Sequence, residues 1–288
     1  VVAAPGRLVD FMECGKVFLQ EVLFLCLDEA DRMLDMGFEP QIRDIVERSD
    51  MPPKDRRQTL MFSATFPKPI QRLAWDFLRP GYMSLTVGRV GAATDSIVQE
   101  CVFARTNDEK PDLLIDLLSS TNIEGKRVLV FVETKRAADM LEQMLYGAKF
   151  PATSIHGDRT QKEREQALKS FRDGREPILV ATDVAARGLD IPNVAHVVNF
   201  DMPQSIDDYV HRIGRTGRAG NDGHATAFIT EKDNRVAREL VDVLAEARQT
   251  IPTWLENLCA QADYGGYNRG GRSGGGRSGG YGGGRSGG

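Results

Sequence analysis

Short apolar stretches alternate with helical segments along most of this 288-residue chain, and this alternation constrains its fold more than any other feature. Apolar runs this short are typical of strands that are buried in a parallel sheet. Regular alternation of strands and helices predicts an α/β fold, with parallel sheets covered by helices. The predicted strands are Val22–Leu27, Thr59–Phe62, Val128–Val132, Ile178–Ala181, His196–Phe200 and Ala225–Thr230.

Two of the intervening helices carry capping residues at their expected starts. Thr160 and Glu163 have the spacing of a capping box, and Ser205 with Asp208 has a similar pattern. Apolar residues at helical spacing mark two more helices. The predicted helices cover Ala137–Leu145, Gln161–Arg172, a segment from Ser205 toward His211, and Asp233–Ala247.

The periodic pattern breaks near Gly88–Asp95, where Gly, Ala and Thr replace it, and we expect an interdomain linker there. A second break begins at Tyr264, where a Gly- and Arg-rich tail starts that cannot bury a core. The predicted segments are 1–90, the later part of a first domain; 91–97, the linker; 98–250, a complete second domain that folds alone; 251–263, a C-terminal extension; and 264–288, a disordered tail.

Charge is distributed unevenly between the tail and the rest of the chain. The net charge is −4, but residues 264–288 hold four of the 37 basic residues and none of the 41 acidic ones. The remaining chain therefore carries −8. If it binds a polyanion, it must do so through a local basic track rather than through a global positive field.

Several other classes of protein are disfavoured by composition. The longest apolar run, Val22–Leu27, is far too short to cross a bilayer, and no secretory signal is visible. The four cysteines never form a Cys-x-x-Cys pair, so we expect reduced thiols rather than zinc ligands or disulfides, which fits an intracellular location.

Polar residues follow the predicted strands at the points where ligands bind in α/β proteins. Val22–Leu27 runs directly into Asp28-Glu29-Ala30-Asp31. One carboxylate there can hold Mg²⁺ through water, and a second can orient an attacking water. The alternative is an acidic, solvated turn. Ser63-Ala64-Thr65 follows the next strand, where a simple helix cap is the alternative.

Two arginines, Arg215 and Arg218, lie three residues apart in a second candidate segment, His211–Arg218. On a helical turn they would share one face. Two guanidinium groups aimed together suit the spread charge of a transferring phosphoryl group. A solvated basic surface is the alternative.

Together these motifs resemble those of the DEAD-box RNA helicases of superfamily 2, and most closely the Belle/Vasa-type branch. The resemblance runs from about residue 3 to 258 and implies two RecA-like domains. The motifs that carry it are Pro5-Gly6-Arg7-Leu8, Asp28-Glu29-Ala30-Asp31, Met33–Phe38, Ser63-Ala64-Thr65, Val130–Thr134, His156-Gly157-Asp158-Arg159, Ala186–Asp190 and His211–Arg218.

The resemblance implies ATP-dependent unwinding of short RNA duplexes, with ATP and Mg²⁺ as cofactors. Asp28 would coordinate Mg²⁺ through water, and Glu29 would position or deprotonate the hydrolytic water. The implied ATP-binding residues are Arg187, Gly188, Asp190, Arg215 and Arg218, the last two as arginine fingers, and the implied interdomain coupling residues are Asp31, Ser63, Thr65 and His211.

The resemblance also implies sequence-independent binding of RNA, through phosphates and 2′-hydroxyl groups. Ala4 stands where the family usually has Thr, so one phosphate contact should be lost. The implied RNA-binding residues are Gly6, Arg7, Thr134, Gln161, Arg164 and Thr182.

The phosphate-binding loop of the family, Gly-x-x-x-x-Gly-Lys-Ser/Thr, does not occur in these 288 residues, and the chain begins at Val1 without a methionine. We therefore expect an N-terminally truncated helicase whose first domain is incomplete and which is inactive alone. A truncated, non-catalytic isoform that binds RNA or protein is the alternative, and a DNA-directed relative is a weaker one.

The branch suggests messenger RNA as the partner, with proteins of translation or of ribonucleoprotein granules. It also suggests a monomer in the cytoplasm, with granules and the nucleus as further locations.

The tail generates a first test. Its arginines and tyrosines can pair with phosphates and stack on bases, each stack contributing about 1–3 kcal/mol. Deletion of residues 264–288 should weaken RNA binding and flatten its salt dependence, as measured by titration at several salt concentrations. Unchanged affinity at low salt would show that the tail is only a spacer.

Overall fold

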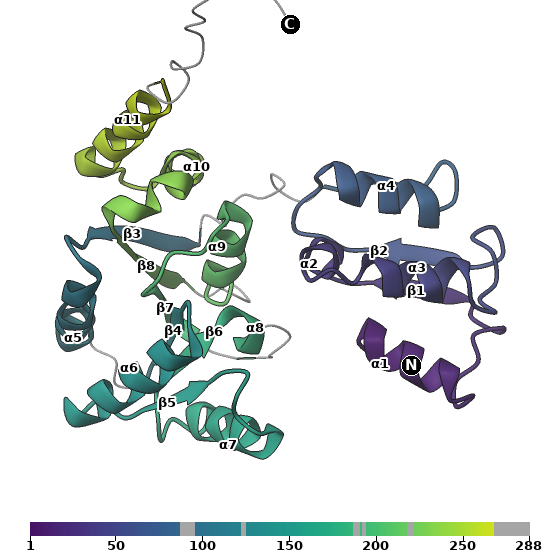
Figure 1. Ribbon diagram of the computed structural model, residues 1–288, viewed down its shortest axis with the longest axis horizontal. Coiled ribbons are helices and arrows are strands. Elements are labelled where there is room, and N and C mark those ends of the chain that lie inside the picture. The colour runs from purple at the N-terminus through teal and green to yellow at the C-terminus, as the bar shows by residue number, and fades with distance from the viewer. Residues whose placement is uncertain (87–95, 122–124, 187–190, 192–193, 218–221, 268–288) are drawn as a thin grey trace, which may run out of the picture. The chain divides into compact units, whose positions relative to one another are not determined.

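The computed structural model divides the chain into two compact units, Val1–Ala92 and Ala93–Gly288. It describes residues 1–86, 96–121, 125–186, 191, 194–217 and 222–267, the last seven of these by their backbone alone. The tail predicted from residue 264 therefore falls almost wholly outside the described residues. Both units are built from parallel strands and helices, as the alternating pattern predicts (Figure 1).

The first unit is a two-stranded parallel sheet with four helices. Phe24 pairs with Gln58 and Leu27 with Met61 in the ladder between its strands. Helices contribute most of its core, in which Ile42, Ile70 and Phe77 are fully buried. Its elements are α1 (Pro5–Glu13), β1 (Phe24–Leu27), α2 (Ala30–Asp35), α3 (Glu39–Glu47), β2 (Gln58–Met61) and α4 (Lys68–Phe77).

The prediction that these two strands are buried is wrong. In β1 only Leu27 is buried, and in β2 no residue is. Phe24 is 67% exposed and Leu60 is 39% exposed. A sheet of two strands offers little area to its covering helices, so the apolar residues that face away from them stay in contact with solvent.

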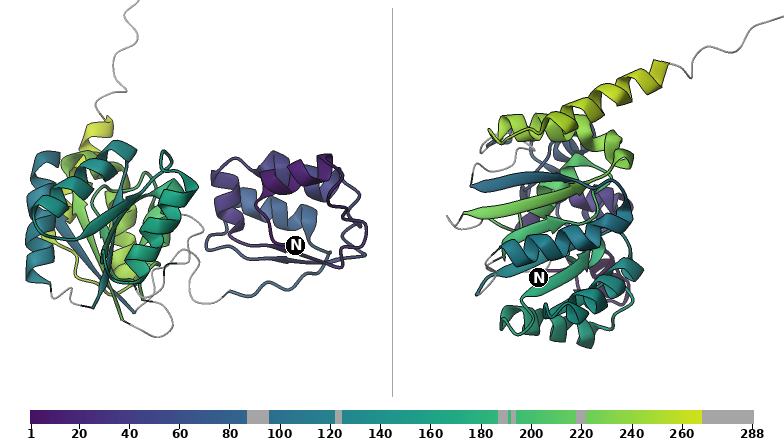
Figure 2. Two further views of the ribbon diagram at one scale, coloured as in Figure 1. Left: turned by 90° about the horizontal axis from the view of Figure 1, so that it is seen from below. Right: turned by 90° about the vertical axis from the view of Figure 1, so that its left-hand side faces the viewer.

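The second unit contains a six-stranded parallel sheet with the order β3-β8-β7-β4-β6-β5. Helices cover both of its faces (Figure 2). Its elements are β3 (Ile97–Phe103), η1 (Asn107–Glu109), α5 (Lys110–Ser120), β4 (Arg127–Val132), α6 (Lys135–Gly147), β5 (Ala152–Ile155), α7 (Gln161–Arg172), β6 (Ile178–Thr182), α8 (Asp183–Ala186), β7 (Val194–Asn199), α9 (Ile206–Ile213), β8 (Gly223–Ile229), η2 (Glu231–Asp233), α10 (Asn234–Glu246) and α11 (Thr253–Tyr267).

Central strand β4 contributes side chains to two hydrophobic cores, one on each face of the sheet. Val128 and Val130 pack with α5 and α6 on one face, whereas Leu129 and Phe131 pack with α7 and α8 on the other. Because successive side chains of a strand point to opposite faces, a continuous apolar run is needed here. The sequence pattern of β4 therefore matches its position in the middle of the sheet.

Two strands of this sheet, β3 and β5, were not predicted. Gln99 and Ser154 interrupt their apolar patterns, but both side chains are buried and hydrogen-bonded. The Tyr209 hydroxyl donates to Gln99 Oε1 at 3.0 Å, and the Ser154 hydroxyl donates to Glu142 Oε2 at 2.7 Å. Polar side chains can occupy buried strand positions when their partners are supplied by other elements.

The two helix starts that were predicted from capping residues are confirmed. Thr160 and Glu163 form both hydrogen bonds of a capping box at the start of α7, and the Ser205 hydroxyl accepts from the Asp208 N–H at the start of α9. The C-terminal helix α11 also contributes to the core, since Leu255 and Leu258 are buried in the cluster around α10. Among the described helices, none combines the length and the apolar character of a transmembrane span.

A buried histidine makes the stability of the second unit dependent on pH. His196 lies in β7, is 8% exposed and contacts Thr226 Oγ1 at 2.8 Å through Nε2. Burial, with smaller contributions from His224 and Lys126, lowers the pKa of His196 to about 4. Because the folded pKa lies below the unfolded value near 6.5, the neutral ring stabilises the fold above about pH 6.5. This contribution is lost as the pH falls toward 4.

We expect residues 93–267 to lose about 2 kcal/mol of unfolding free energy through His196 between pH 7 and 5. Urea denaturation at a series of pH values measures this loss. His196→Gln should flatten the profile, whereas His224→Gln, which removes only a smaller cause of the lowered pKa of His196, should flatten it much less. Equal slopes for all three proteins would contradict the assignment to His196.

Candidate functional site

The first candidate group lies at the carboxyl end of β1. Asp28 and Glu29 follow the strand directly, and both side chains are exposed. The Asp28 carboxylate accepts from the Glu29 N–H at 3.0 Å, and Glu29 has a left-handed backbone with φ +50°. A non-glycine residue in this conformation is uncommon, so the turn is a specific local structure. It presents two carboxylates at the sheet edge where ligands bind in α/β proteins.

Asp31, three residues further along, is 4% exposed and has a different environment. Its Oδ2 accepts from the Thr65 N–H at 2.8 Å, from the Ala64 N–H at 3.1 Å and from the Thr65 hydroxyl at 3.1 Å. The Asp31 N–H donates to the Ser63 hydroxyl at 3.2 Å. The helix after β1 and the loop after β2 are therefore joined by one buried carboxylate, which we call the Asp31 clamp.

The Asp31 clamp brings together three of the four residues that were assigned to interdomain coupling. Asp31, Ser63 and Thr65 all belong to the first unit, and they contact one another within it. His211 lies in the last turn of α9 in the second unit and is half-buried. Coupling between the two units through these residues stays a prediction.

The predicted RNA contacts of the first unit lie in the first turn of α1. Arg7 is exposed, lies 3.5 Å from Asp10 Oδ2 and stacks over the Phe11 ring at 4.5 Å from its centre. Gly6 precedes it, and a side chain added at Gly6 would meet no atom within 4 Å. Ala4 is the N-cap and provides no side-chain hydrogen bond, which is the position where the family's threonine would stand. An exposed guanidinium here is accessible to a phosphate.

The predicted RNA contacts of the second unit gather at one edge of its sheet. Thr134 follows β4 and caps α6, accepting from the Ala137 N–H at 3.1 Å. Gln161 and Arg164 occupy the first turn of α7, which follows β5, and Thr182 ends β6. Because β4, β6 and β5 are neighbouring parallel strands, their carboxyl ends meet at the same edge. Thr182 is buried, whereas Thr134 and Gln161 are exposed.

A buried arginine that the sequence analysis did not assign organises the segment around α9. Arg212 is 2% exposed and donates from Nε to Asp183 Oδ1 at 2.7 Å and from Nη2 to Asp183 Oδ2 at 2.6 Å. Its Nη1 donates to Asn199 Oδ1 at 3.0 Å and to the Asp201 carbonyl at 2.6 Å. The guanidinium also lies over the Phe131 ring, 5.0 Å from its centre. This paired arginine ties α9 to the ends of β6 and β7.

A signal for Arg212 was present in the sequence. Tyr209, Arg212 and Ile213 have the i, i+3, i+4 spacing of a buried helix face, and all three are buried. A charged residue within such a face predicts a buried ion pair, because an unpaired charge there would be costly. The same spacing rule therefore distinguishes Arg212 from the two later arginines of this segment.

The expectation that Arg215 and Arg218 share one face of a helical turn stays a prediction, because Arg218 lies outside the described residues. Helix α9 ends at Ile213, and Gly217 has φ +65°, so Arg215 lies in an irregular turn. A Cβ added at Gly217 would come within 2.6 Å of Ile97 Cγ1, so the turn needs glycine for its backbone and for space. Arg215 is 9% exposed in this turn.

The remaining predicted nucleotide contacts lie outside the described residues. These are Arg187, Gly188, Asp190 and Arg218.

The residues at the end of β1 fit a weakly coordinated magnesium ion. Among the described residues there is no group of three or more His, Cys, Asp or Glu side chains that could hold a metal. Mg²⁺ usually keeps several waters and binds through one or two carboxylates together with substrate phosphates. An exposed Asp28 is consistent with that mode, in which the protein contributes a single carboxylate.

The Asp31 clamp generates a test with a matched control. Asp31→Asn removes the charge from a buried acceptor of three hydrogen bonds and should cost about 3 kcal/mol of stability in the first unit. Hydrogen exchange of the Ala64 and Thr65 amides should also accelerate. Asp28→Asn makes the same chemical change at an exposed position and should cost less than about 0.5 kcal/mol. Equal losses in chemical denaturation would contradict a special role for Asp31.

Comparison with known proteins gives matches to two family models. A DEAD/DEAH box helicase model matches residues 1–73, and a model of the helicase conserved C-terminal domain matches residues 109–220. Together they include the Asp31 clamp and the sheet edge with Thr134, Gln161 and Thr182.

Solved structures extend this similarity over most of the chain. S. cerevisiae Dbp5 bound to RNA and ADP BeF3 is 31% identical, with a TM-score of 0.74 over 91% of this chain and 68% of that chain. The yeast DEAD-box splicing factor Prp28 is 33% identical, with a TM-score of 0.54 over 93% of this chain, which spans only 58% of the Prp28 chain. A DEAD box protein from Methanococcus jannaschii is 35% identical, with a TM-score of 0.50 over 87% of this chain and 65% of that one. With both domain models matched in order, and with 31% identity across two thirds of Dbp5, the chain belongs to the DEAD-box helicase family.

Proposed function

We propose that this chain is part of the catalytic core of an RNA-dependent ATPase that separates short RNA duplexes locally. The observation that carries the proposal is the similarity to Dbp5, which was solved with RNA and ADP BeF3 and of which this chain covers 68% at 31% identity. The motifs at the carboxyl ends of the strands supply the carboxylates, guanidinium groups and hydroxyls that binding of nucleotide and RNA would need. We propose ATP as the nucleotide and sequence-independent RNA as the polymer.

In this proposal the first unit activates water and the second unit stabilises charge. Bound ATP and Mg²⁺ would supply the phosphoryl group and part of the charge neutralisation. Asp28 would hold the ion through water, and Glu29 would orient the hydrolytic water and accept its proton. Arg215 and Arg218 would face the charge that develops on the transferring group, with Arg187, Gly188 and Asp190 holding the nucleotide. Arginine fingers contribute about 10³–10⁵ in rate in other phosphoryl-transfer enzymes.

Coupling of hydrolysis to RNA would follow from the division of these residues between two units. Asp28 and Glu29 belong to one unit and Arg215 to the other, so they can act together only when the units close on ligand. The Asp31 clamp would transmit this closure, because it joins the turn that carries Glu29 to the Ser63–Thr65 loop. His211 would be its counterpart in the second unit.

RNA would be held by its backbone. Arg7 in the first unit and Arg164 in the second offer guanidinium groups for phosphates, while Thr134 and Thr182 offer hydroxyls. Contacts of this kind give affinity without base selection. Closure of the two units on one strand would bend it and separate a short duplex. We further propose messenger RNA as the target and the cytoplasm, including ribonucleoprotein granules, as the location, because the motifs resemble the Belle/Vasa-type branch.

The alternative proposal is a non-catalytic module that binds RNA or protein. The 288 residues lack the Gly-x-x-x-x-Gly-Lys-Ser/Thr loop that binds ATP phosphates, and the first unit has a sheet of only two strands, in which Phe24 is exposed. Sequencing of the transcript upstream of Val1 separates the two. An in-frame Gly-x-x-x-x-Gly-Lys-Thr favours the enzyme, and an initiator just before Val1 favours the module.

Residues 1–288 alone should show no RNA-stimulated ATP turnover, because their sequence does not contain the phosphate-binding loop. Phosphate release with and without RNA measures this, and wild type and Glu29→Gln should be indistinguishable. RNA binding by the same preparation is the control for a functional fold. A longer chain that includes such a loop should hydrolyse ATP when RNA is added, and Glu29→Gln should abolish that activity. Turnover by residues 1–288 that depends on Glu29 would contradict the first expectation, and an inactive longer chain would contradict the proposed enzyme.

A further inference from the structure

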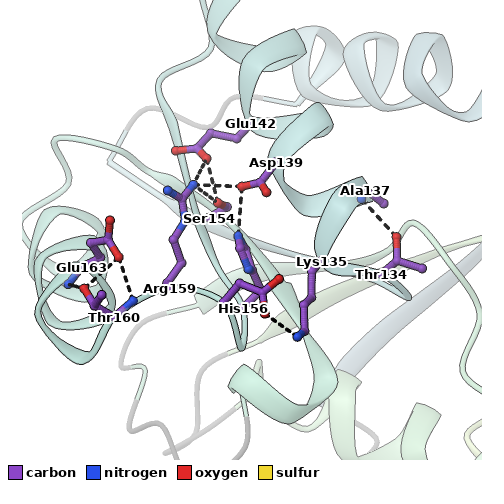
Figure 3. A network of polar contacts seen from close by, with 11 residues as sticks. Thr134, Lys135, Ala137, Asp139, Glu142, Ser154, His156, Arg159, Thr160 and Glu163 are labelled. Carbon is purple, nitrogen blue, oxygen red and sulfur yellow. Dashed lines mark hydrogen bonds and ion pairs between the residues drawn. The ribbon is translucent and has the colours of Figure 1, made fainter.

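A polar network joins the loop 156–160 to helix α6 in the second unit (Figure 3). Its centre is Arg159, whose Nη2 lies 3.0 Å from Asp139 Oδ1, 2.8 Å from Glu142 Oε2 and 2.9 Å from Ser154 Oγ. The Ser154 hydroxyl in turn donates to Glu142 at 2.7 Å. One guanidinium nitrogen therefore connects the loop to α6 and to β5.

The network is partly buried: the side chains of Arg159 and Asp139 are 31% and 44% exposed, but they contact groups that are buried. His156 is 3% exposed, and its Nε2 lies 2.9 Å from Asp139 Oδ1, the same oxygen that Arg159 contacts. Ser154 is also buried, and Glu142 is about one quarter exposed. Asp139 and Glu142 are three residues apart on one face of α6, where two carboxylates repel each other unless a cation lies between them. Arg159 is placed to provide that charge.

A second connection ties the same loop to the start of α6. Lys135 Nζ lies 2.5 Å from Asp158 Oδ1, and this hydrogen bond lowers the pKa of the Asp158 carboxyl below its usual range. Gly157 lies beneath the lysine, because a Cβ there would come within 3.3 Å of Lys135 Cε. The loop is thus attached to α6 at its first residue and again one to two turns further along.

The two ends of this network are adjacent to residues with a predicted role. Thr134 caps α6 immediately before Lys135, and Gln161 begins α7 two residues after Arg159. Thr160, between Arg159 and Gln161, caps α7. Anything that fixes Arg159 against α6 therefore also fixes the first turn of α7 relative to Thr134.

We propose that Arg159 is a positioning residue for RNA, which holds the first turn of α7 at the spacing from Thr134 that a single RNA backbone requires. The proposal rests on the proposed function, since it concerns the RNA contacts of the second unit. Arg159 acts through Gln161 and Arg164 and does not itself have to touch the strand. A rigid supporting network keeps binding groups in a productive geometry, and its loss reduces affinity even when every contacting residue is present.

The test is binding of a labelled single-stranded RNA to the full 288-residue chain, followed by fluorescence anisotropy. Arg159→Ala should raise Kd about tenfold, comparable to the loss of one charge-assisted hydrogen bond. Arg175→Ala removes the same charge from an exposed pair with Asp173 near the other end of α7 and should change Kd less than about twofold.

Glu142→Ala distinguishes positioning from direct charge contact with RNA. Removal of an acidic residue should tighten binding to a polyanion if only charge matters. If Glu142 holds Arg159 in place, its loss should weaken binding severalfold, whereas the control Asp173→Ala should leave Kd unchanged or slightly lower. Arg159→Lys keeps the charge but not the branched contacts, so it should restore only a small part of the affinity.

Hydrogen exchange provides a readout that does not involve RNA. In Arg159→Ala the amides from Thr160 to Arg164 should exchange faster, while those of β4 and β6 keep their protection. In the double variant Arg159→Ala/Arg164→Ala, the fold-increase in Kd should be smaller than the product of the fold-increases in the two single variants. The reason is that both changes act on the same contact.

The outcomes separate this proposal from the proposed function. If Arg164→Ala weakens binding but Arg159→Ala or Glu142→Ala does not, positioning by Arg159 is refuted while the RNA site stands. If the wild-type chain does not bind RNA, or if Arg164→Ala has no effect, the RNA site fails and this proposal fails with it. If Arg159→Ala does not fold, Arg159→Lys and Glu142→Ala carry the same test.

Discussion

A single buried residue, Asp31, joins the turn after β1 to the loop after β2 in the first unit. Its carboxylate accepts three hydrogen bonds from the Ala64–Thr65 segment, and its backbone N–H donates to the Ser63 hydroxyl. A buried charge is stable only when its hydrogen-bonding capacity is filled, so the loop after β2 and the turn after β1 must keep their relative positions. Asp28 and Glu29 are exposed, but their backbone is held in place on both sides, because they lie between β1 and Asp31.

The second unit uses the same principle with the opposite sign. Arg212 is a buried guanidinium whose donors are taken by Asp183, Asn199 and the Asp201 carbonyl. It connects α9 to the ends of β6 and β7, and thereby positions the turn that carries Arg215. In each unit, a buried charged residue with hydrogen-bonded partners holds neighbouring elements together. Other charged residues lie at the carboxyl ends of the strands, where we propose that ligands bind. Arg159 extends this arrangement to the edge where the RNA contacts are proposed.

Much of the fold could be predicted because local and global signals agree. Strand β4 is apolar on both faces and lies in the middle of the sheet, and the capping box of Thr160 and Glu163 marks the start of α7 to the residue. The missed strands β3 and β5 contain Gln99 and Ser154, whose partners Tyr209 and Glu142 are distant in sequence. A pattern of single residues cannot reveal partners of this kind. Spacing alone also does not reveal that α9 ends at Ile213 or that Gly217 has a left-handed backbone, so it did not predict the turn that holds Arg215.

The proposed hydrolysis depends on guanidinium groups of one unit and carboxylates of the other acting on the same nucleotide. The most direct measurement is a crystal structure of a longer polypeptide that contains the phosphate-binding loop, determined with a nonhydrolysable ATP analogue and single-stranded RNA. We expect Arg215 and Arg218 to lie within hydrogen-bonding distance of the terminal phosphate, with Glu29 beside the attacking water. A structure in which both arginines point away from that phosphate would contradict the mechanism.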